Sequence, residues 1–223
     1  MAPISSKQDT AGEKAYQRIR ADILMGRLAP GQRLKLDQLN KDYNASISTL
    51  RELLNRLSSE QLVLAEGQRG FEVSPVSVED LKEIAALRQL LETHALEQSF
   101  ARGDLDWEAR VVAAHHKLSS LEAQRKAGDH TETESWKRYD WQFHQTLISA
   151  CGSRRLMETH TGVFDKYLRY QMLALSDRGE IAIREHRMLL ECALRRDHET
   201  ATEVLTMHIA GGVEYALATG TIG

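Results

Sequence analysis

Apolar side chains in residues 46–58 recur with the spacing of a helix that buries one face. Leu50, Leu53, Leu54 and Leu57 follow the i, i+3, i+4, i+7 pattern, and Ser46 stands at a good N-cap position. The opposite face carries short polar or charged side chains, namely Ser48, Thr49, Arg51, Glu52 and Asn55. A helix divided in this way packs its leucines inward and leaves its polar N-terminal half available to a partner.

Two shorter helices precede this one. Apolar positions in residues 16–24 predict an amphipathic helix, which the Pro30-Gly31 pair brings to an end. Residues 35–43 predict a second short helix, and residues 44–46 predict the turn that joins it to the leucine-bearing helix. A short helix, a turn and a second helix form a compact helix-turn-helix unit.

Two β-prone runs follow, at residues 62–65 and 71–73. The turn between them contains Gly67 and Gly70, with Arg69 at its tip. A hairpin in this place is the wing of a winged helix-turn-helix domain, whose second helix enters the major groove of DNA. A helical hairpin that contacts no nucleic acid is the alternative for the helix pair taken alone.

The rest of the chain shows helical periodicity and no strand signal. Ser77 is the expected N-cap of its first helix, and Gly103 is expected to end that helix. Glycines or Asp197 separate further helical stretches, which cover about residues 105–127, 131–151, 153–175, 179–196 and 198–218. The fold class is therefore mainly α, with a winged helix-turn-helix domain before an all-α antiparallel bundle of about six helices.

Charge divides the chain as the elements do. Residues 1–74 carry 11 Lys and Arg against 9 Asp and Glu, a net of +2, and the other residues carry 18 against 23, a net of −5. This modest asymmetry has the sign that DNA binding requires, and it favours paired copies over a general positive field. The predicted parts are a flexible N-terminus at residues 1–10, a winged helix-turn-helix domain at 11–74, a hinge at 75–78 and an all-helical domain at 79–223.

The composition of the chain indicates the cellular compartment in which the protein is expected. No apolar run approaches the length of a membrane span, and residues 1–10 lack the apolar core of a signal peptide. We therefore expect a cytoplasmic protein without a membrane partner. Cys151 and Cys192 form no motif and are expected to be reduced.

Histidines and an aspartate fall on stripes of the helical region that are expected to face inward. Asp140 and His144 are one turn apart, and His186 and His208 share faces with apolar residues of two later helices. If the four converge, they provide three imidazole nitrogens and one carboxylate, a set that suits Zn²⁺ or Ni²⁺ and also accepts Mn²⁺ or Fe²⁺. Each residue alone is weak support, because an inward histidine is most often a hydrogen-bonded core residue.

Three roles are open to such a metal. An enzyme would use it as a Lewis acid beside a general base, but every inward acidic residue that can be placed is already used as a ligand. A purely structural metal is a second alternative. The third role requires the least, because an ion with open positions binds the carboxylate of a small organic acid. We favour this binding role and predict no catalytic residue.

Residues 11–74 resemble the winged helix-turn-helix domain of GntR-type bacterial transcription regulators. The resemblance rests on a PG-x-x-L turn, an S-x-[ST]-x-[VL]-RE segment and an RG-F-x-V wing, which here begin at Pro30, Ser46 and Arg69. Many members carry arginine where this chain has Ile47 and proline where it has Thr49. The DNA-binding residues expected here are Lys35, Ser46, Ser48, Thr49, Arg51, Arg69 and Gly70.

Residues 77–218 resemble the all-helical FCD effector domain of the FadR branch of this family. Its metal-binding members carry D-x-x-x-H on one helix and single histidines on two later helices, which match Asp140, His144, His186 and His208. The resemblance also implies that Arg88 lines an effector pocket, whereas its spacing alone allows a surface ion pair with Glu92. His160 matches no ligand position and is expected in the core or behind the ligands.

The resemblance implies a repressor that acts as a homodimer. Two recognition helices would enter successive major grooves, roughly 34–36 Å apart, on a near-palindromic double-stranded operator. A small carboxylate effector would change the bundle, act through Pro75 and release the DNA. Details of the wing region and the following helix resemble CsiR-like regulators, which respond to the dicarboxylate glutarate.

Overall fold

The computed structural model describes residues 11–222 apart from residues 66, 68, 69 and 176. The chain divides into two compact units, residues 1–76 and residues 77–223. The predicted flexible segment at residues 1–10 and the predicted wing tip, Arg69, lie outside the described residues.

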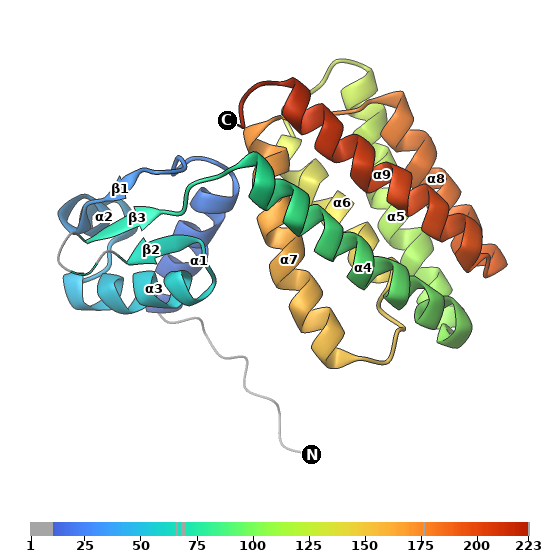
Figure 1. Cartoon of the computed structure of the whole chain (residues 1–223), viewed down its shortest axis with the longest axis horizontal. Coiled ribbons are helices and arrows are strands. Elements are labelled where there is room, and N and C mark those ends of the chain that lie inside the picture. Colours follow the sequence, from blue (N-terminus) through green and yellow to red (C-terminus); the bar gives the residue numbers. More distant parts are fainter. Residues whose placement is uncertain (1–10, 66, 68–69, 176, 223) are drawn as a thin grey trace. The chain divides into compact units, whose positions relative to one another are not determined.

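The first unit combines short helices with a small antiparallel sheet (Figure 1). Strand β3 pairs with both β1 and β2, and Leu34 in β1 lies opposite Phe71 in β3. Strand β1 was not predicted, because two residues are too short to show an alternating pattern. The elements in chain order are α1 (Ala11–Leu24), β1 (Arg33–Leu34), α2 (Leu36–Tyr43), α3 (Ile47–Ser59), β2 (Val63–Ala65) and β3 (Phe71–Val73).

The core of this unit lies between α1, α2, α3 and the sheet. Leu50, Leu54 and Leu57 of α3 are fully buried, whereas Leu53 is only partly buried against the core. Asn44 adopts a left-handed conformation with φ 51° and so ends α2 at the predicted turn. The predicted helix-turn-helix and its buried stripe are therefore present, with Leu53 at the edge of the stripe.

The second unit contains six helices in its described residues, as the sequence predicts. They are α4 (Val78–Arg102), α5 (Leu105–Lys126), α6 (Thr133–Leu147), α7 (Arg154–Leu173), α8 (Glu180–Arg195) and α9 (His198–Ala218). The Ser77 side chain accepts a hydrogen bond from the Asp80 amide, which confirms the predicted cap. Gly103 ends α4 with an ordinary φ of −60°; a Cβ there would lie 2.4 Å from the Trp107 ring, so its small size is what the site requires.

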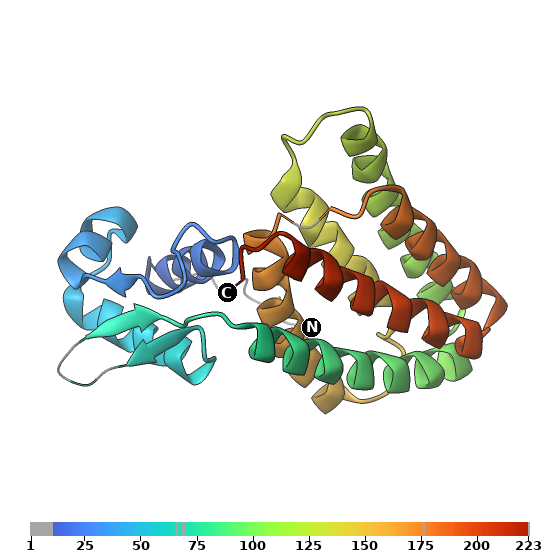
Figure 2. The ribbon, with the colours of Figure 1, turned by 45° about the horizontal axis from the view of Figure 1, so that its top comes forward.

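The six helices pack in a closed ring. Neighbouring pairs are α4 with α9, α9 with α8, α8 with α5, α5 with α6, α6 with α7, and α7 with α4. Figures 1 and 2 both show α4 and α9 side by side along one face of the bundle. This arrangement gives the bundle an interior that every helix can reach. None of the described helices is long and apolar enough to cross a membrane.

Candidate functional site

The N-terminus of α3 presents a group of small polar side chains. Ser46 caps the helix by accepting a hydrogen bond from the Thr49 amide at 3.2 Å, and its Oγ lies 2.9 Å from the hydroxyls of both Ser48 and Thr49. Ser46 and Ser48 are exposed, and Thr49 is half-buried. These hydroxyls are thus ordered by the cap at the end of the helix that carries the positive end of its dipole.

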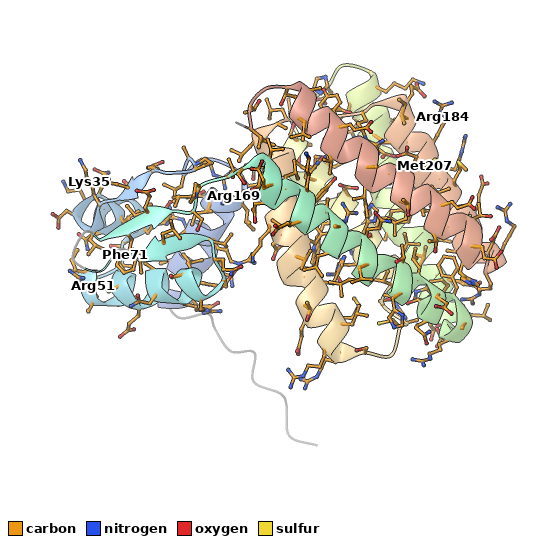
Figure 3. The ribbon with its side chains drawn as sticks, in the orientation of Figure 1. Lys35, Arg51, Phe71, Arg169, Arg184 and Met207 are labelled. Carbon is orange, nitrogen blue, oxygen red and sulfur yellow. The ribbon has the colours of Figure 1, made fainter. Side chains whose placement is uncertain are left out.

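Two basic residues of the same unit are exposed. Lys35 and Arg51 both lie at the left-hand end of the first unit in Figure 3, and neither forms an ion pair with any described residue. By contrast, Arg56 of the same helix binds Glu13 at 3.0 Å and lies over the Tyr16 ring. Lys35 and Arg51 therefore have charges available for phosphates or base edges, while Arg56 stabilises the unit. Gly70 takes φ +95°, which suits the turn before β3.

Inside the second unit, the four predicted metal-binding residues come together. Asp140 and His144 lie on α6, His186 on α8 and His208 on α9, and one ligand atom from each lies within 4.8 Å of the others. The three histidines are buried, and the Asp140 side chain is 15% exposed. The His186 and His208 rings have centroids 4.8 Å apart.

Three atoms at the centre of this cluster have unmet bonding capacity. Asp140 Oδ1, His144 Nε2 and His186 Nε2 are buried and have no hydrogen-bond partner among the described residues. The His186 and Asp140 atoms are 3.2 Å apart, and the His144 and Asp140 atoms are 3.7 Å apart. Buried polar atoms without partners are rare, and a shared cation would satisfy all three.

Each histidine also has a carboxylate beside its other nitrogen. His186 Nδ1 lies 2.7 Å from Glu122, His208 Nδ1 lies 2.8 Å from Glu185, and His144 Nδ1 lies 3.3 Å from Glu92. A carboxylate oxygen accepts, so in a neutral imidazole it favours the tautomer with the hydrogen on Nδ1 and the lone pair on Nε2. This is the usual environment of a metal-binding histidine.

The pKa shifts of the four residues indicate the protonation states in which a metal ion would meet them. Burial, followed by the nearby Arg88 guanidinium, lowers the pKa of His144, and burial keeps the pKa of His208 well below its usual value. Burial opposes ionisation of Asp140, but His186 and Lys137 outweigh it and hold the Asp140 pKa well below the usual range. Burial also opposes the charge on His186, but the adjacent carboxylates of Asp140 and Glu122 outweigh it and raise the His186 pKa to about 9, so a metal ion would replace a proton there. The site therefore offers two neutral imidazoles, one protonated imidazole and an ionised carboxylate.

Arg88 lies within the bundle and not on its surface. It is 2% exposed, its Nε donates to Glu92 at 2.7 Å, and its Nη2 lies 3.2 Å from His144 Nδ1. The ion pair with Glu92 that its spacing allowed does form, but it is buried. Glu92 also accepts from His160 Nε2 at 2.7 Å, which places His160 behind the ligands, as expected.

A small cavity opens at the cluster. It has a volume of about 30 Å³, and Arg88, Lys137, Arg178, Asp140, His186 and His208 are among its lining residues. Arg178 binds Glu185 at 2.5 Å, and its Nη2 lies 2.9 Å from His208 Nδ1. Three cationic side chains therefore line this space, two of them paired with the carboxylates of Glu92 and Glu185.

Sequence reasoning missed the carboxylates behind the histidines. The expectation that the ligand Asp140 accounts for the inward acidic residues is wrong, because Glu92 and Glu122 are 1% and 4% exposed. Two of these carboxylates could have been suspected from the sequence: Glu92 lies one helical turn from Arg88, and Glu185 directly precedes His186. Glu122 carried none, since it is 64 residues from the histidine that it contacts.

The two units, a winged helix-turn-helix domain followed by an all-helical bundle, have the architecture of a class of DNA-binding transcription regulators. Residues 11–73 match the model of bacterial regulatory proteins of the gntR family, and residues 83–211 match the FCD domain. The chain belongs to the GntR family of transcription regulators, in the group with a C-terminal FCD domain. It is therefore a DNA-binding transcription regulator and not an enzyme.

Similar proteins agree with this assignment. BphR, an HTH-type transcriptional regulator of Paraburkholderia xenovorans, is 40% identical over 203 residues, which cover 90% of this chain and 83% of BphR. The HTH-type transcriptional repressor GlaR of Escherichia coli is 30% identical over 203 residues, covering 87% and 90% of the two chains. The solved structure of Escherichia coli McbR/YncC has the same fold, with a TM-score of 0.78, 18% identity and coverage of 94% and 98%.

Proposed function

We propose that the chain is a repressor whose DNA binding is relieved by a small carboxylate bound at a divalent metal ion in the second unit. The observation that carries this proposal is the convergence of Asp140, His144, His186 and His208 within 4.8 Å. The name of the relative GlaR supports the repressing sense, because that protein is described as a repressor.

The four residues fit a metal ion. Ligands about 2.1 Å from one ion lie at most about 4.2 Å apart, whereas the ligand atoms here lie within 4.8 Å of one another, so the widest pair would need to approach by at least about 0.6 Å when an ion binds. Three imidazoles and a carboxylate favour Zn²⁺ or Ni²⁺ and also accept Mn²⁺ or Fe²⁺. A bound ion would supply open Lewis-acid positions for an oxygen of the effector.

The chain's own side chains would hold the rest of the carboxylate. Arg88 uses Nε and Nη2 for the two carboxylate oxygens of Glu92, which leaves Nη1 for a ligand oxygen. Lys137 and Arg178 line the same cavity. A charge-assisted hydrogen bond from such groups adds both affinity and orientation.

On the DNA side, we propose contacts from Lys35, Ser46, Ser48, Thr49, Arg51 and Gly70, together with Arg69, which lies outside the described residues. A homodimer would place two copies of α3 in successive major grooves of a palindromic operator. Residues 75–78 would act as the hinge through which effector binding alters that spacing.

The test combines metal analysis with DNA binding. We expect zinc-loaded protein to shift a palindromic fragment from its own upstream region and to release it when a carboxylate such as glutarate is added. His186→Ala should lose stoichiometric zinc and the response to carboxylate, whereas the exposed His116→Ala on α5 should keep both. Full zinc content in His186→Ala, or a carboxylate response without zinc, contradicts the proposed site.

A purely structural metal is the second candidate, and the small volume of the cavity, about 30 Å³, favours it. In that case His186→Ala would lower stability but leave the response of DNA binding to carboxylates intact. Measuring both quantities on the same variant separates the two roles.

A further inference from the structure

A second, larger cavity adjoins the cavity at the four-residue cluster. The cluster cavity, at about 30 Å³, has room for about two water molecules. The second cavity has a volume of about 280 Å³ and lies between α5, α6 and the first turns of α8. Trp136 and Ala182 line both cavities, so the two spaces share part of one wall.

The two cavities differ in charge. The second is lined by two bases and three acids, a formal net of −1, and its charges are already paired: Arg125 with Asp177 at 2.8 Å and Lys126 with Glu180 at 2.5 Å. The cluster cavity is lined by three bases, Arg88, Lys137 and Arg178, and by one acid, Asp140. Glu92 and Glu185 pair with the two arginines from outside the lining, and a bound divalent ion would add two positive charges to the cavity. An anionic group therefore prefers the cluster cavity, and an uncharged body prefers the second.

The walls of the second cavity suit an aromatic body. Trp136, Ala182 and Ile183 provide its apolar surface. An apolar cavity of about 150 Å³ holds benzene, so this space accepts a phenyl ring with part of a chain. At the shared wall, the buried Trp136 Nε1 has no hydrogen-bond partner in the described part of the chain, which leaves one donor for an oxygen of a passing ligand.

We propose that the second cavity takes the apolar body of the effector, so that the ligand is an arylalkanoate: an aromatic ring joined to a carboxylate by a short chain. This inference rests on the proposed function, because the carboxylate end occupies the cluster cavity. Glu122 lines the second cavity and holds His186 by a 2.7 Å contact, so the bound ring lies beside a residue that orients the cluster.

The first experiment measures ligand affinity in the full-length, zinc-loaded protein. Acetate, glutarate, benzoate, phenylacetate, 3-phenylpropanoate and 4-phenylbutanoate are titrated by calorimetry. We expect at least one of the three arylalkanoates, which carry a chain between ring and carboxylate, to bind at least tenfold more tightly than acetate and glutarate, because burial of the ring adds to the carboxylate contact. The series of chain lengths measures how far the ring must extend past Trp136.

The second experiment fills the cavity. Ile183 lines only the larger space, so Ile183→Trp should lower the affinity for the preferred aromatic acid at least tenfold while leaving zinc content and acetate binding within about twofold. Ile181→Trp is the matched control, because Ile181 is 52% exposed on the same helix and should change nothing. Ile183→Phe, a smaller change, should give an intermediate loss, and thermal unfolding checks that each variant is folded.

The outcomes separate this inference from the proposed function. If no acid binds the zinc-loaded protein, both are overturned. If acetate or glutarate binds but the aromatic acids bind no more tightly, the arylalkanoate assignment alone is wrong. The same holds if Ile183→Trp leaves the affinity for the aromatic acids unchanged. If the aromatic acid binds zinc-free protein with the same affinity, its carboxylate does not bind at the four-residue cluster. That result also overturns the arylalkanoate assignment.

Discussion

Each histidine of the four-residue cluster has one ring nitrogen committed to a carboxylate. In the pair of His186 with Glu122, the 2.7 Å contact fixes both the ring orientation and the tautomer. Burial opposes the charge on His186, but the adjacent carboxylates of Asp140 and Glu122 outweigh it and raise its pKa to about 9. Glu122 thus influences the affinity of His186 for a proton and for a metal ion, although Glu122 is not one of the four converging residues.

Glu122→Gln should therefore weaken zinc binding. Loss of such a partner typically costs roughly 10- to 100-fold in metal affinity, because the imidazole becomes less basic and less well oriented. Competition with a chromophoric chelator measures the change. Glu108→Gln, on the same helix but paired with Arg196, is the control and should keep the affinity of the unaltered protein. An unchanged affinity in Glu122→Gln means that Glu122 does not support a metal ligand.

Arg51 allows a test of the DNA surface. Because Arg51 is exposed and has no ion-pair partner among the described residues, Arg51→Ala should leave stability unchanged and weaken operator binding by about 1–3 kcal/mol per contact. If the contact is to a phosphate, the slope of log affinity against log salt should also become shallower by about 1. Gel-shift titrations at several salt concentrations measure both. Arg184→Ala, on α8 in the other unit, should match the unaltered protein.

Single residues also show how far the sequence could predict the site. Asp140 and His144 were found because four residues on a helix return to the same face, and His186 and His208 because they interrupt apolar stripes. The pairing of Glu122 with His186 depends on how α5 and α8 are rotated against each other. Periodicity within one helix carries no information on that rotation, so the carboxylates behind the histidines could not be predicted.

At the scale of elements, the helices of the bundle follow from local signals. Side chains of Ser77, Asp104, Ser153 and Asp197 cap four of them, and left-handed residues close others, so their limits could be predicted to within a few residues. Close approaches between helices could not. Gly212 of α9 packs against α7, where a Cβ would lie 2.3 Å from Tyr167 Oη.

Two glycine substitutions should therefore have opposite effects. Gly212→Ala forces Tyr167 to move and should destabilise the second unit by about 1–3 kcal/mol, as overpacked cores do. Gly162→Ala on α7 meets no described atom within 4 Å, so it should stabilise the unit by about 0.5–1 kcal/mol through the better helix propensity of alanine. Urea unfolding measures both changes. A stabilising Gly212→Ala contradicts the close contact between α7 and α9.

At the scale of the whole molecule, the two units differ in net charge and in the ligand that each is expected to bind. The first 74 residues carry a net charge of +2, which is small for a DNA-binding domain, and the remainder carries −5. One copy alone should then bind DNA weakly, and pairing of two copies would raise the affinity by linking two half-sites. Because the candidate metal ligands all lie in the second unit, a bound metal would act on a different compact unit from the one that binds DNA.

Zinc should consequently stabilise one unit and not the other. A ligand that binds only the folded state adds about 2.7 kcal/mol when it is present at 100 times its Kd. Differential scanning calorimetry of the full chain should show two transitions, of which zinc raises the one for residues 77–223 and leaves the one for residues 1–76 in place. Chelator should reverse the shift, and His186→Ala should abolish it. A single transition that moves as a whole with zinc indicates that the two units unfold together. The metal would then raise the unfolding temperature of the DNA-binding unit as well.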